Sequence, residues 1–268
     1  MMQQTDLSMD LKGTNILITG GGGYGVASGI CQALSQLGAR LIINEPTEEK
    51  LDAVMKRYPD AVPAPADISK PEEVKVMFDR LGREVGTIHG LVNNAGIGLS
   101  RLAHEASEEE FDHLYRVDIK GVWIMSGYFV RQLLNNKAEG NIVNVSSVHA
   151  RSTMARYAIY AGAKAAVEGL TRGMAVELGM YGIRVNAIAP GYVHAEQNYA
   201  LIGTWTNDPH GWIRHYIENE QAIPRAVDPL DCGHVAAFLL SGLSRSVTGQ
   251  TIYVDNGDTI KLTGAMPA

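Results

Sequence analysis

The chain has 268 residues and a mass of 29.0 kDa, which suits one large α/β domain with a substantial buried core. Its composition, 46% hydrophobic and 19% charged, argues against intrinsic disorder, and a net charge of -6 without a basic stripe gives no support for nucleic-acid binding. Residues 1–6 lack the apolar stretch of a secretory signal, and no apolar run reaches the ~18 residues of a membrane span. We therefore expect a soluble, cytoplasmic protein with no nucleic-acid or membrane partner.

Apolar strand-like runs alternate with helical patterns along the chain. The expected strands cover residues 15–19, 40–44, 61–65, 88–92, 141–146, 184–188 and 251–254. The expected helices cover about 26–37, 47–57, 71–84, 108–134, 158–180 and 229–240. Strands that are apolar on both faces and alternate with helices predict a parallel sheet covered on both sides. Right-handed crossovers then predict an α/β, Rossmann-type doubly wound sheet of about seven strands, in a single domain over residues 1–268.

A glycine-rich turn joins the first expected strand to the first expected helix. Four consecutive glycines begin at Gly20 and include Gly22, and Gly25 directly precedes Val26 and the helix. Backbone N–H groups and the helix dipole at such a terminus attract a pyrophosphate, and glycines permit positive φ and close approach of the ligand. A plain turn is the alternative, but it does not require four consecutive glycines. The pattern predicts a dinucleotide-binding loop.

The second expected strand leads into an acidic residue, Glu45. A carboxylate at this strand tip can bind both hydroxyls of the adenosine ribose and repels a 2′-phosphate. No Arg or Lys is adjacent, since Pro46 and Thr47 follow. The residue predicts NAD rather than NADP; the alternative is an ordinary polar position at the protein surface.

The two cysteines, Cys31 and Cys232, lie within expected helices and have no metal-ligand spacing. We expect both thiols to be reduced and buried. No cluster of metal-ligating residues is evident, so no catalytic metal is expected.

A long stretch over residues 190–229 shows no regular pattern. It contains Trp205 and Trp212 among polar and turn-forming residues. An irregular segment of this length within a compact domain is usually a lid or a binding loop. We expect it to cover the substrate.

The most specific chemistry lies in Ser147, Tyr160 and Lys164. Tyr160 and Lys164 are four apart, so on a helix they share one face, and a Lys ammonium there lowers the pKa of a neighbouring phenol. Ser147 follows an apolar run that reads as a strand end, where its hydroxyl can hydrogen-bond the oxygen of a carbonyl or alcohol. Tyr and Lys are common on helix surfaces, so the pair gains its meaning from the motifs around it.

Together these motifs resemble the short-chain dehydrogenase/reductase family over nearly the whole chain. Ser147, Tyr160 and Lys164 match the family's catalytic residues at the expected spacing. Asp67 and Ile68 look like the pair that holds the adenine, and an Asn-Asn-Ala-Gly segment follows the fourth strand. By this resemblance, the cofactor-binding residues beyond the glycine loop and Glu45 are Asp67, Ile68, Asn94, Ala95, Gly96, Tyr160, Lys164, Pro190, Gly191 and Val193.

The chain departs from the family's pattern at three places. The glycine loop is one residue longer than usual, and Ala27 stands where the last glycine would be. Asp118 replaces the usual catalytic Asn, which supports a water-linked proton relay to the Lys; Asp118 can serve if the backbone carbonyl holds the water, but not if the side-chain amide is required. Ala195 replaces a Thr that often binds the nicotinamide carboxamide.

The resemblance implies a hydride transfer between the nicotinamide and a secondary alcohol or ketone. Tyr160 exchanges the proton with the substrate oxygen, Ser147 orients that oxygen, and Lys164 lowers the Tyr pKa and binds the nicotinamide ribose. His149, Arg151 and His194 are expected to join Ser147 and Tyr160 at the substrate. This polar set favours a sugar, polyol or sugar acid oxidised by NAD, with His149 as a structural histidine and Arg151 as a surface residue as the alternatives.

Two other substrate classes and one other function stay open. A small hydroxy acid is the second choice, and a 3-oxoacyl thioester is the third, because reductases of that kind usually take NADPH, which Glu45 disfavours. A non-catalytic NAD-binding regulator is kept open by Asp118 and Ala195 and opposed by the intact Ser147, Tyr160 and Lys164. The family resemblance also implies a homotetramer or homodimer joined through the helices expected at 108–134 and 158–180.

Overall fold

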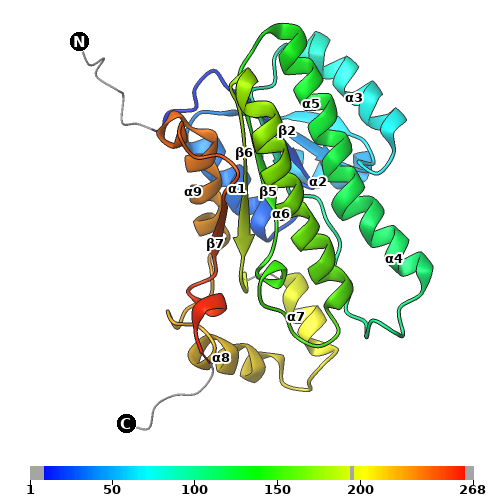
Figure 1. Ribbon diagram of the computed structural model, residues 1–268, viewed down its shortest axis with the longest axis vertical. Helices are drawn as coiled ribbons and strands as arrows, with labels where there is room; N and C mark the ends of the chain where they lie inside the picture. The colour runs from blue at the N-terminus through cyan, green and yellow to red at the C-terminus, as the bar shows by residue number, and fades with distance from the viewer. Residues whose placement is uncertain (1–8, 194–195, 263–268) are drawn as a thin grey trace.

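The computed structural model describes residues 9–193 and 196–262; His194 and Ala195, singled out above, lie outside the described residues. Seven parallel strands form one sheet in the order β3-β2-β1-β4-β5-β6-β7, as Figure 1 shows. The strands are β1 (Asn15–Thr19), β2 (Arg40–Glu45), β3 (Val62–Pro65), β4 (Gly90–Asn93), β5 (Gly140–Val145), β6 (Ile183–Pro190) and β7 (Thr251–Val254). This order confirms the predicted doubly wound sheet. The chain runs outward from β1 to β3, then returns to β4 on the other side of β1, so the strand order reverses between β1 and β4.

Helices cover both faces of the sheet and create a hydrophobic core on each side (Figure 1). One core includes residues of α1 (Val26–Gln36), α2 (Glu48–Met55) and α9 (Pro229–Leu240). The other includes residues of α3 (Pro71–Glu84), α5 (Val122–Asn136) and α6 (Ala158–Leu178). Alternate residues of β1 point to opposite cores: Ile16 and Ile18 to the first, Leu17 to the second. This double burial explains why the strands are apolar throughout.

The packing of α1 against α9 depends on glycine. A Cβ atom on Gly29 would lie 1.8 Å from the carbonyl oxygen of Pro229, and one on Gly233 would lie 2.1 Å from the carbonyl oxygen of Gly29. Only glycine lets the two helix backbones approach so closely. The contact fixes α1, and with it the helix terminus that faces the cofactor site.

The helix expected over residues 108–134 is interrupted. The structure has α4 (Glu108–Tyr115), a π-helical segment over Arg116–Gly121, and then α5. Such wide turns are rare and occur often at functional sites. This one contains Asp118 and Gly121, and a Cβ atom on Gly121 would lie 2.7 Å from the Ile68 side chain.

The stretch expected to be irregular over residues 190–229 contains two helices, α7 (Glu196–Gly203) and α8 (Pro209–Asn219). The Asp208 side chain accepts a hydrogen bond from the Gly211 N–H and so caps α8, and Pro209 occupies its first turn. Both helices lie beyond the carboxyl ends of the strands, at the bottom of Figure 1. That edge of the sheet is where ligands bind in doubly wound folds.

Candidate active site

A cavity of about 1060 Å³ opens at the carboxyl edge of the sheet, between the glycine loop, the strand ends and α7 and α8. Most residues predicted to bind a cofactor or substrate line it, although they come from seven separate parts of the chain. These are Gly20, Gly22, Gly25, Val26, Glu45, Asp67, Ile68, Asn94, Ala95, Gly96, Ser147, His149, Tyr160, Lys164, Pro190, Gly191 and Val193. The structure therefore brings these residues together around one cavity, whereas Arg151 and Asp118 do not belong to its lining.

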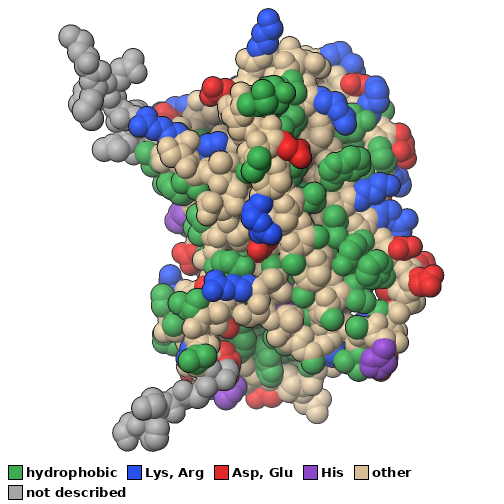
Figure 2. Space-filling view, viewed as in Figure 1, with side chains coloured by type: hydrophobic (Ala, Val, Ile, Leu, Met, Phe, Trp, Pro, Cys, Tyr) green, Lys and Arg blue, Asp and Glu red, His purple; other side chains and the backbone are tan. Residues whose placement is uncertain are grey.

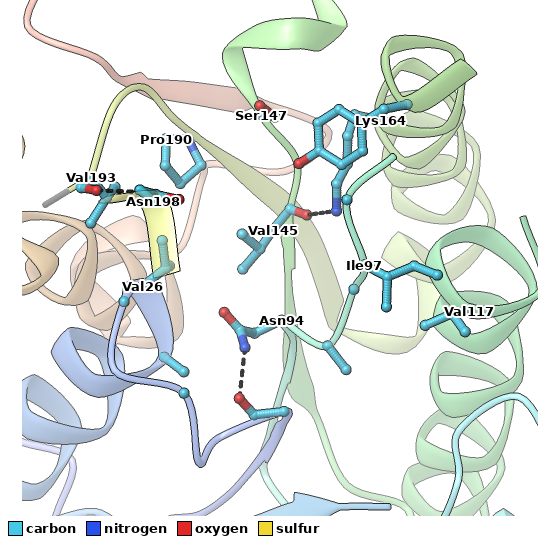
Figure 3. Close-up of a pocket in the computed structure, with 18 of the residues that line it drawn as sticks. Val26, Asn94, Ile97, Val117, Val145, Ser147, Lys164, Pro190, Val193 and Asn198 are labelled. Carbon is cyan, nitrogen blue, oxygen red and sulfur yellow. Dashed lines mark hydrogen bonds between the residues drawn. The ribbon is translucent and has the colours of Figure 1, made fainter. Parts of the chain in front are cut away.

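The glycine loop lies directly against the neighbouring strand ends. Gly20 has φ of +62°, and a Cβ atom there would lie 2.9 Å from the Cα atom of Ala95. The Asn94 amide donates to the carbonyl oxygens of Thr19 (3.0 Å) and Gly20 (3.1 Å), and Figure 3 shows this side chain reaching toward the loop. The N-terminus of α1 has no side-chain cap at Gly25. Its first backbone N–H groups can therefore bind a phosphate, and the absent Cβ atom of Gly20 lets the loop pack closely against Ala95.

Glu45 is buried at the end of β2 and fixed by the glycine loop. Its Oε1 atom accepts a hydrogen bond of 2.7 Å from the Gly22 N–H, and a Cβ atom on Gly22 would lie 2.7 Å from the same oxygen. On the far side of the loop, Arg57 donates to the Gly22 carbonyl oxygen at 2.7 Å and lies over the Tyr24 ring. Arg57 holds the loop without lining the cavity, while Lys50 of α2 does line it.

Asp67 and Ile68 follow β3 and line the cavity. The Asp67 carboxylate accepts hydrogen bonds from the Ser69 N–H (2.9 Å) and hydroxyl (2.8 Å). Burial raises the pKa of Asp67, but the Ser69 hydrogen bonds and the Lys70 charge outweigh it, so the pKa lies below its usual value. Asp67 is thus an ionised hydrogen-bond acceptor at neutral pH, which suits an exocyclic amine.

The three catalytic candidates meet on one side of the cavity. Ser147 follows β5 and is buried, with its hydroxyl accepting a 3.3 Å hydrogen bond from the His149 N–H. Tyr160 is half-buried on the first turn of α6, and the Lys164 Nζ atom lies 5.5 Å from the centre of its ring. Lys164 also donates to the Val145 carbonyl oxygen at 3.3 Å, the contact drawn in Figure 3. The lysine thus joins the end of β5 to the tyrosine.

Asp118 forms a buried ion pair with Lys164. Its Oδ2 atom lies 3.0 Å from the Lys164 Nζ atom, and its Oδ1 atom accepts a 2.8 Å hydrogen bond from the Ile97 N–H. Burial lowers the pKa of Lys164, but the Tyr160 oxygen and the Asp118 carboxylate outweigh burial, so the pKa lies above its usual value. Lys164 is therefore a fixed ammonium group. Asp118 therefore influences the site by holding Lys164 in place. The sequence did not reveal this direct ion pair.

The substrate end of the cavity differs from the sequence expectation. His149 lines it, stacks on Tyr157 at 4.5 Å and meets the Tyr160 ring at 5.6 Å. Arg151, directly after the 3₁₀ turn of Val148–Ala150, instead lies exposed over the Tyr253 ring. Arg151 therefore does not line the cavity in this structure, unlike the other described residues expected at the substrate.

The structure identifies aromatic residues of the site that the sequence did not predict individually. Tyr157, Trp205, Trp212 and Tyr216 all line the cavity. Tyr157 precedes Tyr160 by three residues, a spacing that places both on one helix face and that could have identified it. Trp205 and Trp212 could be assigned to the cavity lining only after the positions of α7 and α8 were known.

Among the described residues, no group of three or more His, Cys, Asp or Glu side chains is placed to hold a metal ion. Across residues 9–193 and 196–262, none of the helices has the length and hydropathy that crossing a bilayer requires. Cys31 and Cys232 are both buried and unpaired, as expected.

Comparisons with known proteins agree with this arrangement. A family model named adh_short_C2 and described as "Enoyl-(Acyl carrier protein) reductase" matches residues 21–259. The chain is 34% identical over 251 residues to the 5-keto-D-gluconate 5-reductase of Escherichia coli (strain K12), covering 92% of this chain and 96% of that protein. It is 33% identical over 270 residues to the hydroxynaphthalene reductase-like protein Arp2 of Metarhizium anisopliae, covering 96% and 99% of the two chains.

Solved structures are also similar to this chain. A gluconate 5-dehydrogenase from Burkholderia cenocepacia, in complex with NADP and tartrate, superimposes with a TM-score of 0.87 and 31% identity, covering 95% of this chain and 98% of that one. Levodione reductase superimposes with a TM-score of 0.84 and 30% identity, covering 93% and 98%. The family match, the doubly wound sheet and the Ser147, Tyr160 and Lys164 arrangement agree: the chain belongs to the short-chain dehydrogenase/reductase family of oxidoreductases, which bind a nicotinamide cofactor.

Proposed function

We propose that this protein is an NAD(H)-dependent oxidoreductase that interconverts a secondary alcohol and a ketone on a sugar, a polyol or a sugar acid. The observation that carries the proposal is the meeting of Ser147, Tyr160 and Lys164 on one side of the cavity whose opposite wall is the glycine loop. A small hydroxy acid is the second candidate. A 3-oxoacyl substrate remains the third; the description of the matching family model shares with it the acyl thioester but names an enoyl group in place of the 3-oxo group.

Tyr160 is the proton-transferring group of the proposed reaction. The nicotinamide, when bound, takes up or supplies the hydride. In the oxidation direction the Tyr160 phenolate accepts the hydroxyl proton, and in the reduction direction the phenol donates a proton to the carbonyl oxygen. The Lys164 ammonium, 5.5 Å from the ring centre, favours the phenolate electrostatically. The Ser147 hydroxyl donates to the substrate oxygen, because it already accepts from the His149 N–H.

The preference for NAD rests on Glu45. The Gly22 N–H holds its carboxylate at the tip of β2, where the adenosine ribose of a bound dinucleotide lies. A phosphate at the ribose 2′ position would meet this fixed negative charge. The related Burkholderia structure contains NADP, so membership of the family does not by itself specify the cofactor. Lys50, also in the lining, is the cation available to a 2′-phosphate, and it argues for testing both cofactors.

The substrate proposal has support from relatives and from the cavity. The Escherichia coli relative is named a 5-keto-D-gluconate 5-reductase and the Burkholderia structure a gluconate 5-dehydrogenase. Other relatives are named for hydroxynaphthalene and levodione, so the names of the proteins similar to this chain include compounds of different polarity. A non-catalytic regulator is disfavoured, because Asp118 leaves Lys164 charged and in place.

We also propose that part of the chain acts as a lid over the cavity and that the protein is an oligomer. Helices α7 and α8, within residues 190–229, line the cavity and suit a segment that closes on substrate.

Trp123 of α5 and Val176 of α6 are 56% and 85% exposed, and Figure 2 shows hydrophobic side chains on the face that carries these helices. We propose a homodimer or homotetramer formed through α5 and α6 of a cytoplasmic protein. Light scattering on a size-exclusion column tests the assembly, and cell fractionation tests the location.

The test of the proposed function is NADH formation at mildly alkaline pH with a panel of polyols, sugars, sugar acids, hydroxy acids and simple secondary alcohols. NAD and NADP are supplied in separate reactions. Turnover on a polyhydroxylated substrate with NAD is the expected result. Turnover on hydroxy acids alone moves the assignment to the second candidate. Consumption of NADH or NADPH with a 3-oxoacyl thioester, in a parallel reduction assay and without turnover in the panel, moves it to the third.

A further inference from the structure

The substrate end of the cavity has a continuous aromatic wall, formed by Tyr157, Trp205, Trp212 and Tyr216. The Trp205 ring meets the Tyr157 ring edge-on at 6.2 Å and the Trp212 ring edge-on at 5.6 Å. Trp212 in turn stacks on Tyr216 at 5.4 Å with 9° between the ring planes. All four side chains line the same cavity as Ser147 and Tyr160. The wall reaches the reacting groups at Tyr157, whose ring meets the Tyr160 ring edge-on at 6.0 Å.

Cations are scarce at this end of the cavity. Among the described lining residues, Lys50 and Lys164 are the lysines, and arginine does not occur. Lys50 belongs to α2, close in sequence to Glu45 at the adenosine end, and the Lys164 charge is paired with Asp118. Burial lowers the pKa of His149 below its usual value, so its ring is neutral at neutral pH. His113, the remaining described histidine of the lining, is exposed on α4.

Negative charge gathers behind the wall instead. The Tyr216 hydroxyl donates a 2.5 Å hydrogen bond to the Asp258 Oδ2 atom. Asp255 lies close by, and both it and Glu220 add negative charge around Asp258. An anionic group next to Tyr216 would face these carboxylates, while the nearby Lys261 ammonium group is held by the Asn219 and Gln221 carbonyl oxygens. The local field therefore disfavours an anion.

The aromatic wall, the few cations and the nearby carboxylates together indicate which class of substrate the proposed oxidoreductase takes. A carboxylate that leaves water without a cation or several hydrogen-bond donors loses a large part of its hydration free energy. An aromatic face instead gains by covering C–H groups. We propose that the substrate is uncharged and lays a C–H face on the aromatic wall, as a neutral polyol, sugar or cyclic alcohol does, and that sugar acids are not the preferred substrates. The inference rests on the proposed function and selects one class within it.

The test compares two substrate pairs that differ only in charge. L-sorbose and 5-keto-D-gluconate differ at one terminal carbon, as a hydroxymethyl group and a carboxylate, and are assayed with NADH. Sorbitol and gluconate differ in the same way and are assayed with NAD. We expect kcat/KM for the neutral member of each pair to exceed that of the acid by about 100-fold, because a carboxylate lacking a partner costs a few kcal/mol. Equal values, or a higher value for the acid, would overturn the inference and leave the oxidoreductase assignment standing.

Two variants test the role of the wall. Trp205→Leu removes the ring, and we expect KM for the neutral substrate to rise at least tenfold with a smaller change in kcat. Trp205→Phe keeps an aromatic face and should retain most of the wild-type KM. An unchanged KM in Trp205→Leu would show that the wall does not bind the substrate.

Binding measurements separate this inference from the assignment of activity. Tyr160→Phe saturated with NADH is titrated with each ketone in a calorimeter, because this variant holds the ligand without turning it over. Tighter binding of the neutral ketone supports the inference even if the wild-type protein turns over neither. Tighter binding of the acid overturns it, and absence of binding by either at millimolar concentration overturns it as well.

Discussion

The Asp118 carboxylate lies 3.0 Å from the Lys164 ammonium nitrogen, and both side chains are almost wholly buried. The pair has no net charge, so the positive field that Lys164 exerts on Tyr160 is weaker than that of an unpaired lysine. Among the described residues, the other titratable side chains whose rings contact the Tyr160 ring are His149, which burial keeps neutral, and Tyr157. Asp118 does not line the cavity, but its carboxylate offsets the Lys164 charge and so weakens the positive field at Tyr160.

This relationship predicts the effect of Asp118→Asn on pH dependence. The variant removes one negative charge near Tyr160 and leaves the lysine ammonium unopposed, which favours the phenolate. We expect the rising limb of kcat/KM for alcohol oxidation to move to lower pH, by on the order of one unit. Asp112→Asn, an exposed change on α4, is the control and should leave the profile in place. An unmoved or upward-shifted limb in Asp118→Asn, with the fold intact by circular dichroism, would contradict this account.

Glu45→Gln tests the basis of cofactor choice. The glutamine oxygen can still accept the hydrogen bond from the Gly22 N–H, so the change removes charge and preserves shape. We expect the ratio of kcat/KM for NAD to that for NADP to fall by about 10- to 100-fold, corresponding to about 1.4–2.7 kcal/mol. Glu48→Gln, exposed at the start of α2, is the matched control. A ratio that stays the same would remove Glu45 as the discriminating residue.

Two glycine substitutions test the helix packing behind the cofactor site. Gly29→Ala places a Cβ atom 1.8 Å from a backbone oxygen of α9, and backbone cannot rotate aside, so we expect a loss of about 3 kcal/mol in the free energy of unfolding. Gly82→Ala in α3 meets nothing within 4 Å and should stabilise the protein by up to about 1 kcal/mol through helix propensity. Urea unfolding of both variants measures the difference, and equal stabilities would refute the close α1–α9 contact.

The cysteines provide a further check on packing. Burial raises the pKa of both Cys31 and Cys232 to about 12, so neither forms an appreciable thiolate at neutral pH. We expect no reaction with a thiol reagent in the native protein at pH 7.5 and two equivalents after unfolding in guanidinium chloride. Rapid labelling of one thiol in the native state would show that α1 or α9 opens locally.

Much of the fold was readable from the sequence because the parallel strands are buried on both faces. Each of the seven strands lies within two residues of its expected position, and the glycine loop and Glu45 fall at the strand ends that the sequence indicated. Strand β3 contains Pro63 and Pro65 and yet is correct, because it lies at the edge of the sheet, where a missing N–H is tolerated.

What the sequence did not reveal depends on contacts made after folding. Asp118 and Lys164 meet because the π-helical turn packs against α6, and a wide turn has no characteristic sequence period. Arg151 is close to Ser147 in sequence, but it follows a short 3₁₀ turn and its side chain lies over the Tyr253 ring. The start of α8 at Asp208 and Pro209 was a readable signal that the loop interpretation missed.

The most direct test of the proposed function compares wild-type protein with Tyr160→Phe. Both are assayed for NADH formation on the substrate that the panel identifies, and NAD binding is measured by calorimetry. Tyr181→Phe, which alters an exposed tyrosine, serves as the control. We predict that Tyr160→Phe binds NAD normally and loses about 10²- to 10⁴-fold or more in turnover, as removal of a general acid–base does. Turnover at the wild-type rate in Tyr160→Phe would contradict the mechanism proposed for this site.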